Sequence, residues 1–266
     1  FSAVFLSWTQ TLRAAVAAEV VALDGKTVRR SFDVAKGRSA IHLVSAWASA
    51  NRLVLGQIKV DDKSNEITEV PELLRALELA GCIVTVDALN CQKAIAQEIL
   101  EADAEYVLAL KGNHETAHAE IKSFLDDAVI QAQTPRPAGS PPAAATLATC
   151  QTVEKGHGRI ETRRYYQSAA LAWFADRDQW QGLRTVGMVE AEREIRGQRT
   201  VERRYYLSSL PLDVATFARA VREHWGIENQ VHWVLDVQMS ADQNRARAGH
   251  AAENLALLRR LARNLL

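Results

Sequence analysis

Short apolar stretches, each ended by polar or turn-forming residues, dominate the first sixty residues. The stretches at 20–23, 40–49 and 52–60 are rich in β-branched and large apolar side chains, and Ala50-Asn51 separates the last two. Residues of these kinds favour strands, and short connections favour antiparallel neighbours. The pattern therefore predicts an antiparallel meander of three strands.

The chain then alternates between helical and strand-like segments. Pro71 suits the first turn of a helix, and the leucines after it give that helix an apolar side. Further on, the pattern predicts strands at 82–86 and 106–110 and helices at 92–100 and 115–126. Alternation of this kind is typical of parallel strands joined by helical crossovers.

The sequence pattern changes at residues 134–150. This segment holds four of the six prolines and is predicted to form a flexible loop. Strand-like segments return at 159–167, 184–192 and 200–207, and Arg-Arg-Tyr-Tyr occurs in the first and the last of them. We interpret 151–210 as an inserted β-rich subdomain.

Two helices are predicted to end the chain. In the first, at 214–235, a period of 3.6 residues places Glu228 on the same apolar side as Val221 and Trp225. An acid on such a side must be neutralised, paired or bound to a metal ion, and an internal salt bridge to arginine is the competing interpretation. The second helix, at 252–266, is amphipathic, with four leucines assigned to its apolar side (Leu255, Leu258, Leu261 and Leu265).

The composition narrows the class of protein. Apolar residues make up 48% and charged residues 24% of the 266 residues, the net charge is zero, and no stretch is long and apolar enough for a membrane span. Three scattered cysteines favour neither a zinc cluster nor a disulfide framework, which indicates a reducing, cytoplasmic location. Residues 1–150 hold 14 basic and 18 acidic side chains and the rest hold 18 and 14, a weak indication of a nucleic-acid partner.

Two aspartates follow apolar strands. Asp24 comes after the strand at 20–23, and Asp87 after the strand at 82–86. A strand end is a rigid support for a carboxylate, and carboxylate oxygens are the ligands that Mg²⁺ prefers. A polar residue that merely opens a turn is the competing interpretation, and it is strongest for Asp24-Gly25. Together with Glu228, the two aspartates suggest a site for two metal ions that catalyses phosphoryl transfer.

The chain resembles the H-repeat-associated (ISAs-type) insertion-sequence transposases, a group of DDE enzymes. The matching stretches follow the family's order over nearly the whole chain: LDGKTVR (23–29), HLVSAW (42–47), LGQIKVDDKSNEI (55–67), VTVDALNCQKAIAQEI (84–99), YVLALKGNH (106–114), HGRIETR (157–163), YYLSSL (205–210), HWGIENQVHWVLDV (224–237) and ENLALLRRLARNLL (253–266).

The resemblance implies a ribonuclease H-like catalytic core, with a mixed sheet flanked by helices and an inserted β-rich subdomain. It implies a core at 1–133 and 211–266, the proline-rich loop at 134–150 and the insertion at 151–210. Asp24, Asp87 and Glu228 take the positions of the family's three acids, which would bind two Mg²⁺ or Mn²⁺ ions.

The implied function is DNA transposition by cleavage and strand transfer at the ends of an insertion sequence, with double-stranded DNA and a second copy of the protein as partners. Five basic residues are candidates for contacts with DNA phosphates (Lys26, Arg29, Lys111, Arg159 and Arg163). For Arg159 and Arg163 the alternative is pairing with Glu161, and for Glu66 we prefer a simple place at a helix N-terminus. For His224 and His232, which flank Glu228, we prefer packing to metal ligation.

Two other functions remain open at this point. One is a related nuclease that cuts without joining, and the other is a remnant that binds DNA or a partner without catalysis. Members of the family carry a further segment ahead of the DGK motif, and the chain begins with Phe1, so we expect a longer protein. The sequence differs from the family's common residues at Asn90 and Ala241.

Overall fold

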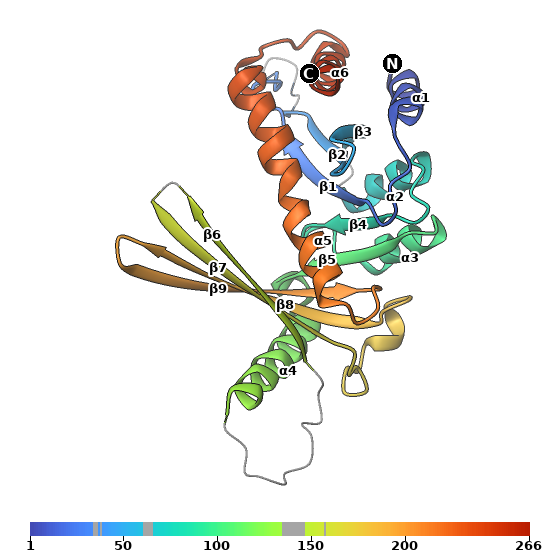
Figure 1. Cartoon of the computed structure of the whole chain (residues 1–266). Helices are drawn as coiled ribbons and strands as arrows, with labels where there is room; N and C mark the ends of the chain where they lie inside the picture. Colours follow the sequence, from blue (N-terminus) through green and yellow to red (C-terminus); the bar gives the residue numbers. More distant parts are fainter. Residues whose placement is uncertain (34–36, 38, 61–65, 135–146, 157) are drawn as a thin grey trace. The chain divides into compact units, whose positions relative to one another are not determined.

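The computed structural model describes residues 1–33, 37, 39–60, 66–134, 147–156 and 158–266 (Figure 1). Contacts divide the chain into a first unit, residues 1–105 with 221–266, and a second unit, residues 106–220. Most of the proline-rich loop lies outside the described residues, but its last three residues belong to a strand, Ala148–Gly156, that the sequence pattern did not predict. The division into a core and an insertion at 151–210 stays a prediction.

The first unit contains a four-stranded mixed sheet in the order β3-β2-β1-β4. Strands β1 and β2, and β2 and β3, are antiparallel, whereas β1 and β4 are parallel. The helices and strands of this unit are α1 (Ser2–Leu12), β1 (Val20–Thr27), β2 (His42–Ala48), β3 (Leu53–Val60), α2 (Glu66–Ala76), β4 (Ile83–Val86), α3 (Lys93–Glu101) and α6 (Ala251–Leu265).

The second unit contains a sheet in the order β5-β9-β8-β7-β6. Strand β9 pairs with β8, β8 with β7, and β7 with β6, and all three long pairings are antiparallel. Its elements are β5 (Glu105–Leu110), α4 (Glu115–Gln133), β6 (Ala148–Gly156), β7 (Arg159–Ser168), β8 (Thr185–Ile195) and β9 (Gln198–Ser208). The two Arg-Arg-Tyr-Tyr segments lie in β7 and β9, on either side of β8.

From β1 to α4 the order of strands and α-helices is three strands, helix, strand, helix, strand, helix. This is the order of the ribonuclease H-like fold, and the mixed α/β fold class is confirmed. Among the described helices none is both long and apolar enough to cross a bilayer.

A long helical segment carries Glu228. Helix α5 (Val214–Gly226) is followed directly by π-helical turns at Ile227–His232 and Val234–Gln238. Figure 1 shows these parts as one continuous helix. Its π-helical part packs on the first unit's core, and Gly226 permits a close approach to Trp47, because an added β-carbon would lie 3.1 Å from the indole Nε1.

Three local predictions were wrong. Strand β1 continues to Thr27, so Asp24-Gly25 lies within a strand and opens no turn. Helix α2 begins at Glu66, which places Pro71 inside the helix. Helix α6 buries Ala252, Ala256, Leu257 and Arg260, whereas Leu258 and Leu265 are exposed.

Candidate active site

Asp24 and Asp87 lie side by side on neighbouring parallel strands. The last matched pair of β1 and β4 is Leu23 with Val86; Asp24 is the next residue of β1, and Asp87 is the first residue after β4. Neighbouring strands are about 4.8 Å apart, and laterally matched residues point to the same face. The sheet therefore brings the two carboxyl groups near each other, although only Asp87 stands at a strand end, because β1 continues to Thr27.

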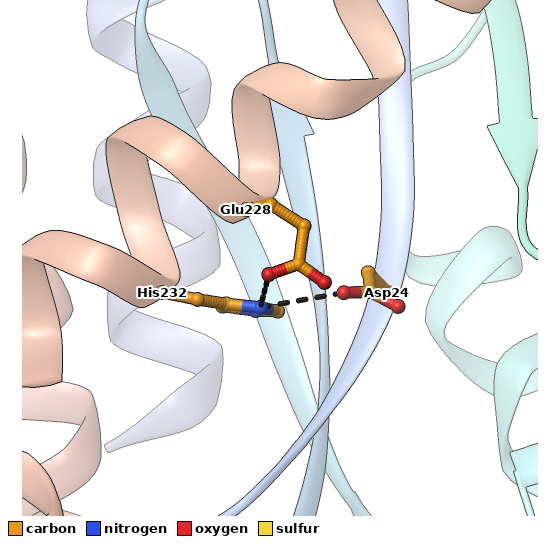
Figure 2. A group of neighbouring side chains, drawn as sticks. All are labelled: Asp24, Glu228 and His232. Atoms are coloured by element: carbon orange, nitrogen blue, oxygen red, sulfur yellow. Dashed lines mark ion pairs between the residues drawn. The ribbon is translucent and has the colours of Figure 1, made fainter. Parts of the chain in front are cut away.

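The π-helical turns bring Glu228 and His232 to the same place. The Nδ1 atom of His232 lies 3.3 Å from Asp24 Oδ2 and 3.6 Å from Glu228 Oε2 (Figure 2). One ligand atom from each of Asp24, Glu228 and His232 lies within 4.8 Å of the others. Residues 204 positions apart in the chain thus form one compact polar cluster.

The wide π-helical turn explains which helix residues face the cluster. In a π-helix the backbone hydrogen bonds join residues five apart, so each turn holds more residues than the 3.6 of an α-helix. Residues four apart therefore lie nearly above one another. Ile227, Val231 and Leu235 form the buried side. Glu228 and His232 lie beside that apolar row, and Glu228 is half exposed rather than on the inward side. Val221 is buried as predicted, but the predicted inward position was wrong for Trp225 and Glu228, because both side chains are exposed.

The electrostatics of Asp24 are those of a crowded acid site. Burial raises the pKa of Asp24 to about 8, with further contributions from the negative charges of Glu228 and Asp87 and from a hydrogen bond with Glu228. The backbone N–H of Gly25 acts in the opposite direction. A cation bound between the acids would reduce the electrostatic repulsion between their carboxylates.

His232 is neutral in this setting. Burial, together with the positive charges of Arg260 and Lys26, lowers the pKa of His232 to about 3. The short distances to Asp24 and Glu228 would make an ion pair only with a protonated ring, so the contact is one between a neutral imidazole and carboxyl groups.

A second layer of polar residues holds the two aspartate-bearing segments. The backbone N–H and the Nδ2 of Asn90 each donate to Asp87 Oδ1 at 3.1 Å, and Nδ2 also donates to Glu66 Oε2 at 2.6 Å. Glu66 is hydrogen-bonded to His42 as well. Burial raises the pKa of Glu66, but the hydrogen bonds from His42 and Asn90 outweigh it and leave the pKa lowered. A side chain at Gly25 would clash with Glu66 and His42.

Glu66 therefore does more than begin a helix. It does lie in the first turn of α2, as predicted, and its buried carboxylate also links the strand of Asp24 to the loop of Asp87. The KSNEI motif contained this residue, but nothing in the local sequence indicated its partners.

A groove of about 700 Å³ opens beside Glu228 and His232. Trp225 and Trp233 line it, with exposed fractions of 37% and 52%. The groove is also lined by two of the predicted DNA-binding residues. Lys26 Nζ lies 2.5 Å from Asp236 Oδ2, whereas the side chain of Arg29 is 79% exposed.

The other predicted DNA-binding residues lie in the second unit. Lys111 is exposed at the end of β5. Arg159 and Arg163 both pair with the buried Glu161, at 3.8 and 2.7 Å. Of the two alternatives for these arginines, the structure shows the pairing, and their contact with DNA stays a prediction.

The donor set suits a divalent cation. Two carboxyl groups and an imidazole nitrogen converge, with a third carboxyl group on the adjacent strand. Carboxylate oxygens are ligands of Mg²⁺ and Mn²⁺, and an imidazole nitrogen is tolerated by Mn²⁺. The mutual repulsion that acts on Asp24 is what a bound cation would offset.

The site thus combines acids from a mixed sheet with an acid from a helix, and comparison with known proteins names the family. Residues 17–265 match the family model "Transposase DDE domain", and the chain belongs to this family.

Individual relatives carry names that match this family. The chain is 39% identical over 270 residues to "Putative transposase YncI" of Escherichia coli O157:H7, covering 100% of this chain and 66% of that protein. It is 37% identical over 271 residues to "H repeat-associated putative transposase YhhI" of E. coli K12, covering 100% of this chain and 68% of the relative. The chain thus spans about two thirds of the length of these relatives.

A solved structure of the piggyBac transposase synaptic complex with hairpin DNA is also similar. The TM-score is 0.48 at 13% identity, and the match covers 96% of this chain and 47% of the piggyBac chain.

Proposed function

We propose that this chain is the catalytic part of an insertion-sequence transposase that cuts and joins DNA. The observation that carries the proposal is the convergence of Asp24 and Glu228, with Asp87 at the level of Asp24 on the adjacent strand. A DDE-domain family and three acids in one site together favour phosphoryl transfer over simple binding.

The reaction has two steps of the same kind. In the first, a water oxygen attacks a phosphorus at the element's end, the bond from phosphorus to the 3′ oxygen breaks, and a free 3′-hydroxyl remains. In the second, that hydroxyl attacks a phosphorus of target DNA, forms a new phosphodiester bond and displaces a target 3′-hydroxyl.

Asp24, Asp87 and Glu228 would hold two Mg²⁺ or Mn²⁺ ions, which supply activation of the attacking oxygen and stabilisation of the leaving one. The protein's own part is to keep the three acids in place. Asn90 holds Asp87 through two hydrogen bonds, and the β1–β2 pairing holds Asp24 opposite Ser45.

The groove beside the acids is the proposed path of the DNA. Arg29 and Lys26 offer donors to phosphates, since Lys26 has three N–H groups and its pairing with Asp236 occupies one contact. Trp233 lines the groove and is 52% exposed, so its ring could stack on an unpaired base at a cut end. We propose double-stranded DNA as the substrate and a homodimer as the active form, since two element ends must be joined in one event.

Replacement of Asp87 by alanine tests the proposal. The protein at its full natural length is incubated with a duplex carrying the inverted repeats that flank its gene, with Mg²⁺ or Mn²⁺. We expect nicking and strand transfer by the wild type and a loss of orders of magnitude in Asp87→Ala, while DNA affinity changes little because Lys and Arg supply the phosphate contacts.

Asp127→Ala, an exposed acid on α4, is the matched control and should keep full activity. Cutting without joining by the wild type would indicate a nuclease instead. DNA binding without metal-dependent cutting would indicate a non-catalytic remnant. Equal cutting by Asp87→Ala would overturn the assignment of the acids.

A further inference from the structure

A straight row of polar side chains runs along the helical segment that carries Glu228. Its members are spaced four residues apart in the chain (His224, Glu228, His232 and Asp236). Figure 2 shows the two central members, Glu228 and His232, directed towards Asp24 of strand β1. The rotation of this segment about its own axis therefore decides whether Glu228 reaches the other acids.

The first and the last members of the row are fastened to the sheet. His224 Nδ1 and Thr85 Oγ1 are hydrogen-bonded at 2.8 Å, and Asp236 Oδ2 lies 2.5 Å from Lys26 Nζ. Thr85 is buried, and the side chain of Lys26 is only 12% exposed. Contacts that are shielded from water in this way are screened less than surface contacts.

The strand residues that the row contacts lie on one face of the sheet. Thr85 is the lateral partner of Ala22 in the parallel β1–β4 pair. Ala22, Asp24 and Lys26 are two residues apart on β1, so their side chains point to the same face. Ala22 also belongs to the core cluster that contains Ile227 of the helical segment. The row thus follows strand β1 from the level of Ala22 to Lys26.

An α-helix cannot keep such a row straight. At 3.6 residues per turn, each step of four residues rotates the side chain by about 40°, so the three steps from His224 to Asp236 amount to about 120°. Asp236 would then point away from Lys26. The wider π-helical turns reduce this rotation, and the N–H of Trp233 donates to the carbonyl of Glu228, five residues earlier.

The π-helical turns need support from the rest of the first unit, because helices of this kind are rare. Apolar packing is one support, since Ile227, Val231 and Leu235 lie in the core. Apolar contact is non-directional, whereas hydrogen bonds and close ion pairs require a defined geometry. The contacts of His224 and Asp236 therefore select one rotation of the segment at each of its ends.

We propose that His224 and Asp236 are positioning residues that hold the π-helical register of this segment and so keep Glu228 beside Asp24. When the pairing of Asp236 with Lys26 is removed, the segment relaxes towards α-helical hydrogen bonding. Its side chains then rotate about the helix axis, and Glu228 turns away from Asp24. This proposal rests on the proposed function for the role of the acids.

Crystal structures of the wild type and of Asp236→Ala, both without metal and DNA, test the register directly. In the wild type we expect the N–H of Trp233 to donate to the carbonyl of Glu228. In Asp236→Ala we expect it to donate to the carbonyl of Asn229, the acceptor in an α-helix. A wild-type bond to Asn229 would overturn the proposal, and so would an unchanged bond to Glu228 in the folded variant.

Titration with Mn²⁺ measures the consequence for the site. Asp236→Ala should weaken Mn²⁺ binding by about tenfold or more, as expected when an outer residue that orients a ligand is lost. Asp236→Glu keeps the charge that pairs with Lys26 and should restore most of the affinity.

Asp242→Ala is the matched control. Asp242 also pairs with a basic residue, Arg29, and its side chain is 24% exposed against 30% for Asp236, but it lies outside the row. The control removes the same charge, so we expect it to keep nearly the wild-type Mn²⁺ affinity. Equal weakening by Asp236→Ala and Asp242→Ala would reduce the effect to net charge and contradict the proposal.

Thr85→Val tests the other end of the row, and it decides the matter if Asp236→Ala does not fold. The substitution removes the hydroxyl that contacts His224 and keeps a β-branched side chain suited to strand β4. We expect Glu228 to be displaced while Asp87 stays in place, with Mn²⁺ binding weakened by about tenfold. A folded Thr85→Val protein with an unmoved Glu228 and wild-type Mn²⁺ affinity would exclude a positioning role for His224.

The two proposals fail separately. The hydrogen-bond acceptor of Trp233 and the affinity for Mn²⁺ are measured without DNA, so neither depends on strand transfer. Equal cutting by Asp87→Ala would overturn the proposed function and leave the register of the helical segment unchanged.

Discussion

Asp24 and Asp87 each stand one residue beyond Leu23 and Val86, the last matched pair of two parallel strands, so the sheet itself sets their carboxyl groups side by side. This relationship destabilises the metal-free protein, because Asp24 is buried beside two other acids. The first prediction follows from this destabilisation.

Asp24→Asn should stabilise the metal-free protein and abolish its stabilisation by metal. At pH 7 the substitution removes a buried acid whose pKa is raised to about 8, and we expect a gain of roughly 1–2 kcal/mol in the free energy of unfolding. Wild type should gain about 2.7 kcal/mol at a Mn²⁺ concentration of 100 times Kd, and the variant none. Urea denaturation with and without Mn²⁺ measures both. The exposed Asp127→Asn is the control; an equal metal effect in Asp24→Asn would count against the site.

Gly25→Ala should disturb the support beneath the acids. A β-carbon at this position would clash with Glu66 and His42, both part of the polar layer that holds Asp87. We expect a loss of about 1–3 kcal/mol in unfolding free energy, as for overpacking of a filled site. Gly112→Ala is the matched control, since nothing lies within 4 Å of its added β-carbon. Denaturation of both variants under identical conditions gives the comparison, and similar losses in the two would contradict the role of Gly25.

Trp233→Ala should weaken binding to DNA ends with unpaired bases. The side chain is 52% exposed in the groove, so its removal should change stability little. Loss of one stacked base costs about 1–3 kcal/mol, which fluorescence anisotropy with frayed and fully paired duplexes can resolve. Val237→Ala removes another exposed apolar side chain of the same helix and should have no effect on either duplex. Equal weakening on both duplexes by Trp233→Ala would argue against stacking.

Asp126→Asn should reduce the stability of the protein at neutral pH but not in acid. Burial raises the pKa of Asp126, but the hydrogen bonds from Lys122 and Tyr205 and the charge of Arg203 outweigh it and leave the pKa lowered. A lowered folded-state pKa adds stability above the unfolded value of 3.8, and that stability is lost as the pH falls through the folded-state pKa. The difference in unfolding free energy between wild type and variant should therefore shrink below about pH 4. A difference that is constant from pH 7 to pH 3 would exclude this linkage.

The strands and their acids could be predicted from the sequence because their causes are local. Apolar runs define β1 and β4, and Asp24 and Asp87 follow those runs directly, so two acids at matched positions of neighbouring strands could be expected, although β1 continues past Asp24. Glu228 was also identified, through its family motif and through an argument about an apolar helix face. That second argument was wrong in detail, since Trp225 and Glu228 are both exposed.

The reason for that error is physical. A period of 3.6 residues was extended through Gly226, but the helix there takes π-helical turns, and its buried side shifts to Ile227, Val231 and Leu235. No local preference distinguishes a π-helical turn from an α-helical one, because it persists only where packing holds it.

His232 and Arg260 belong to the part that only the tertiary structure decided. Both amino acids occur at helical positions where periodicity assigns them to packing or to solvent. His232 contacts Asp24 of strand β1, and Arg260 donates to Ser45 of strand β2, across separations of up to 215 residues along the chain. The sequence by itself determined the strands with apolar runs and the acids that follow two of them, whereas the largely exposed strand β6 was missed because it has no such run. Which polar atoms are buried against one another depends on how distant elements pack, and that was visible only in the folded chain.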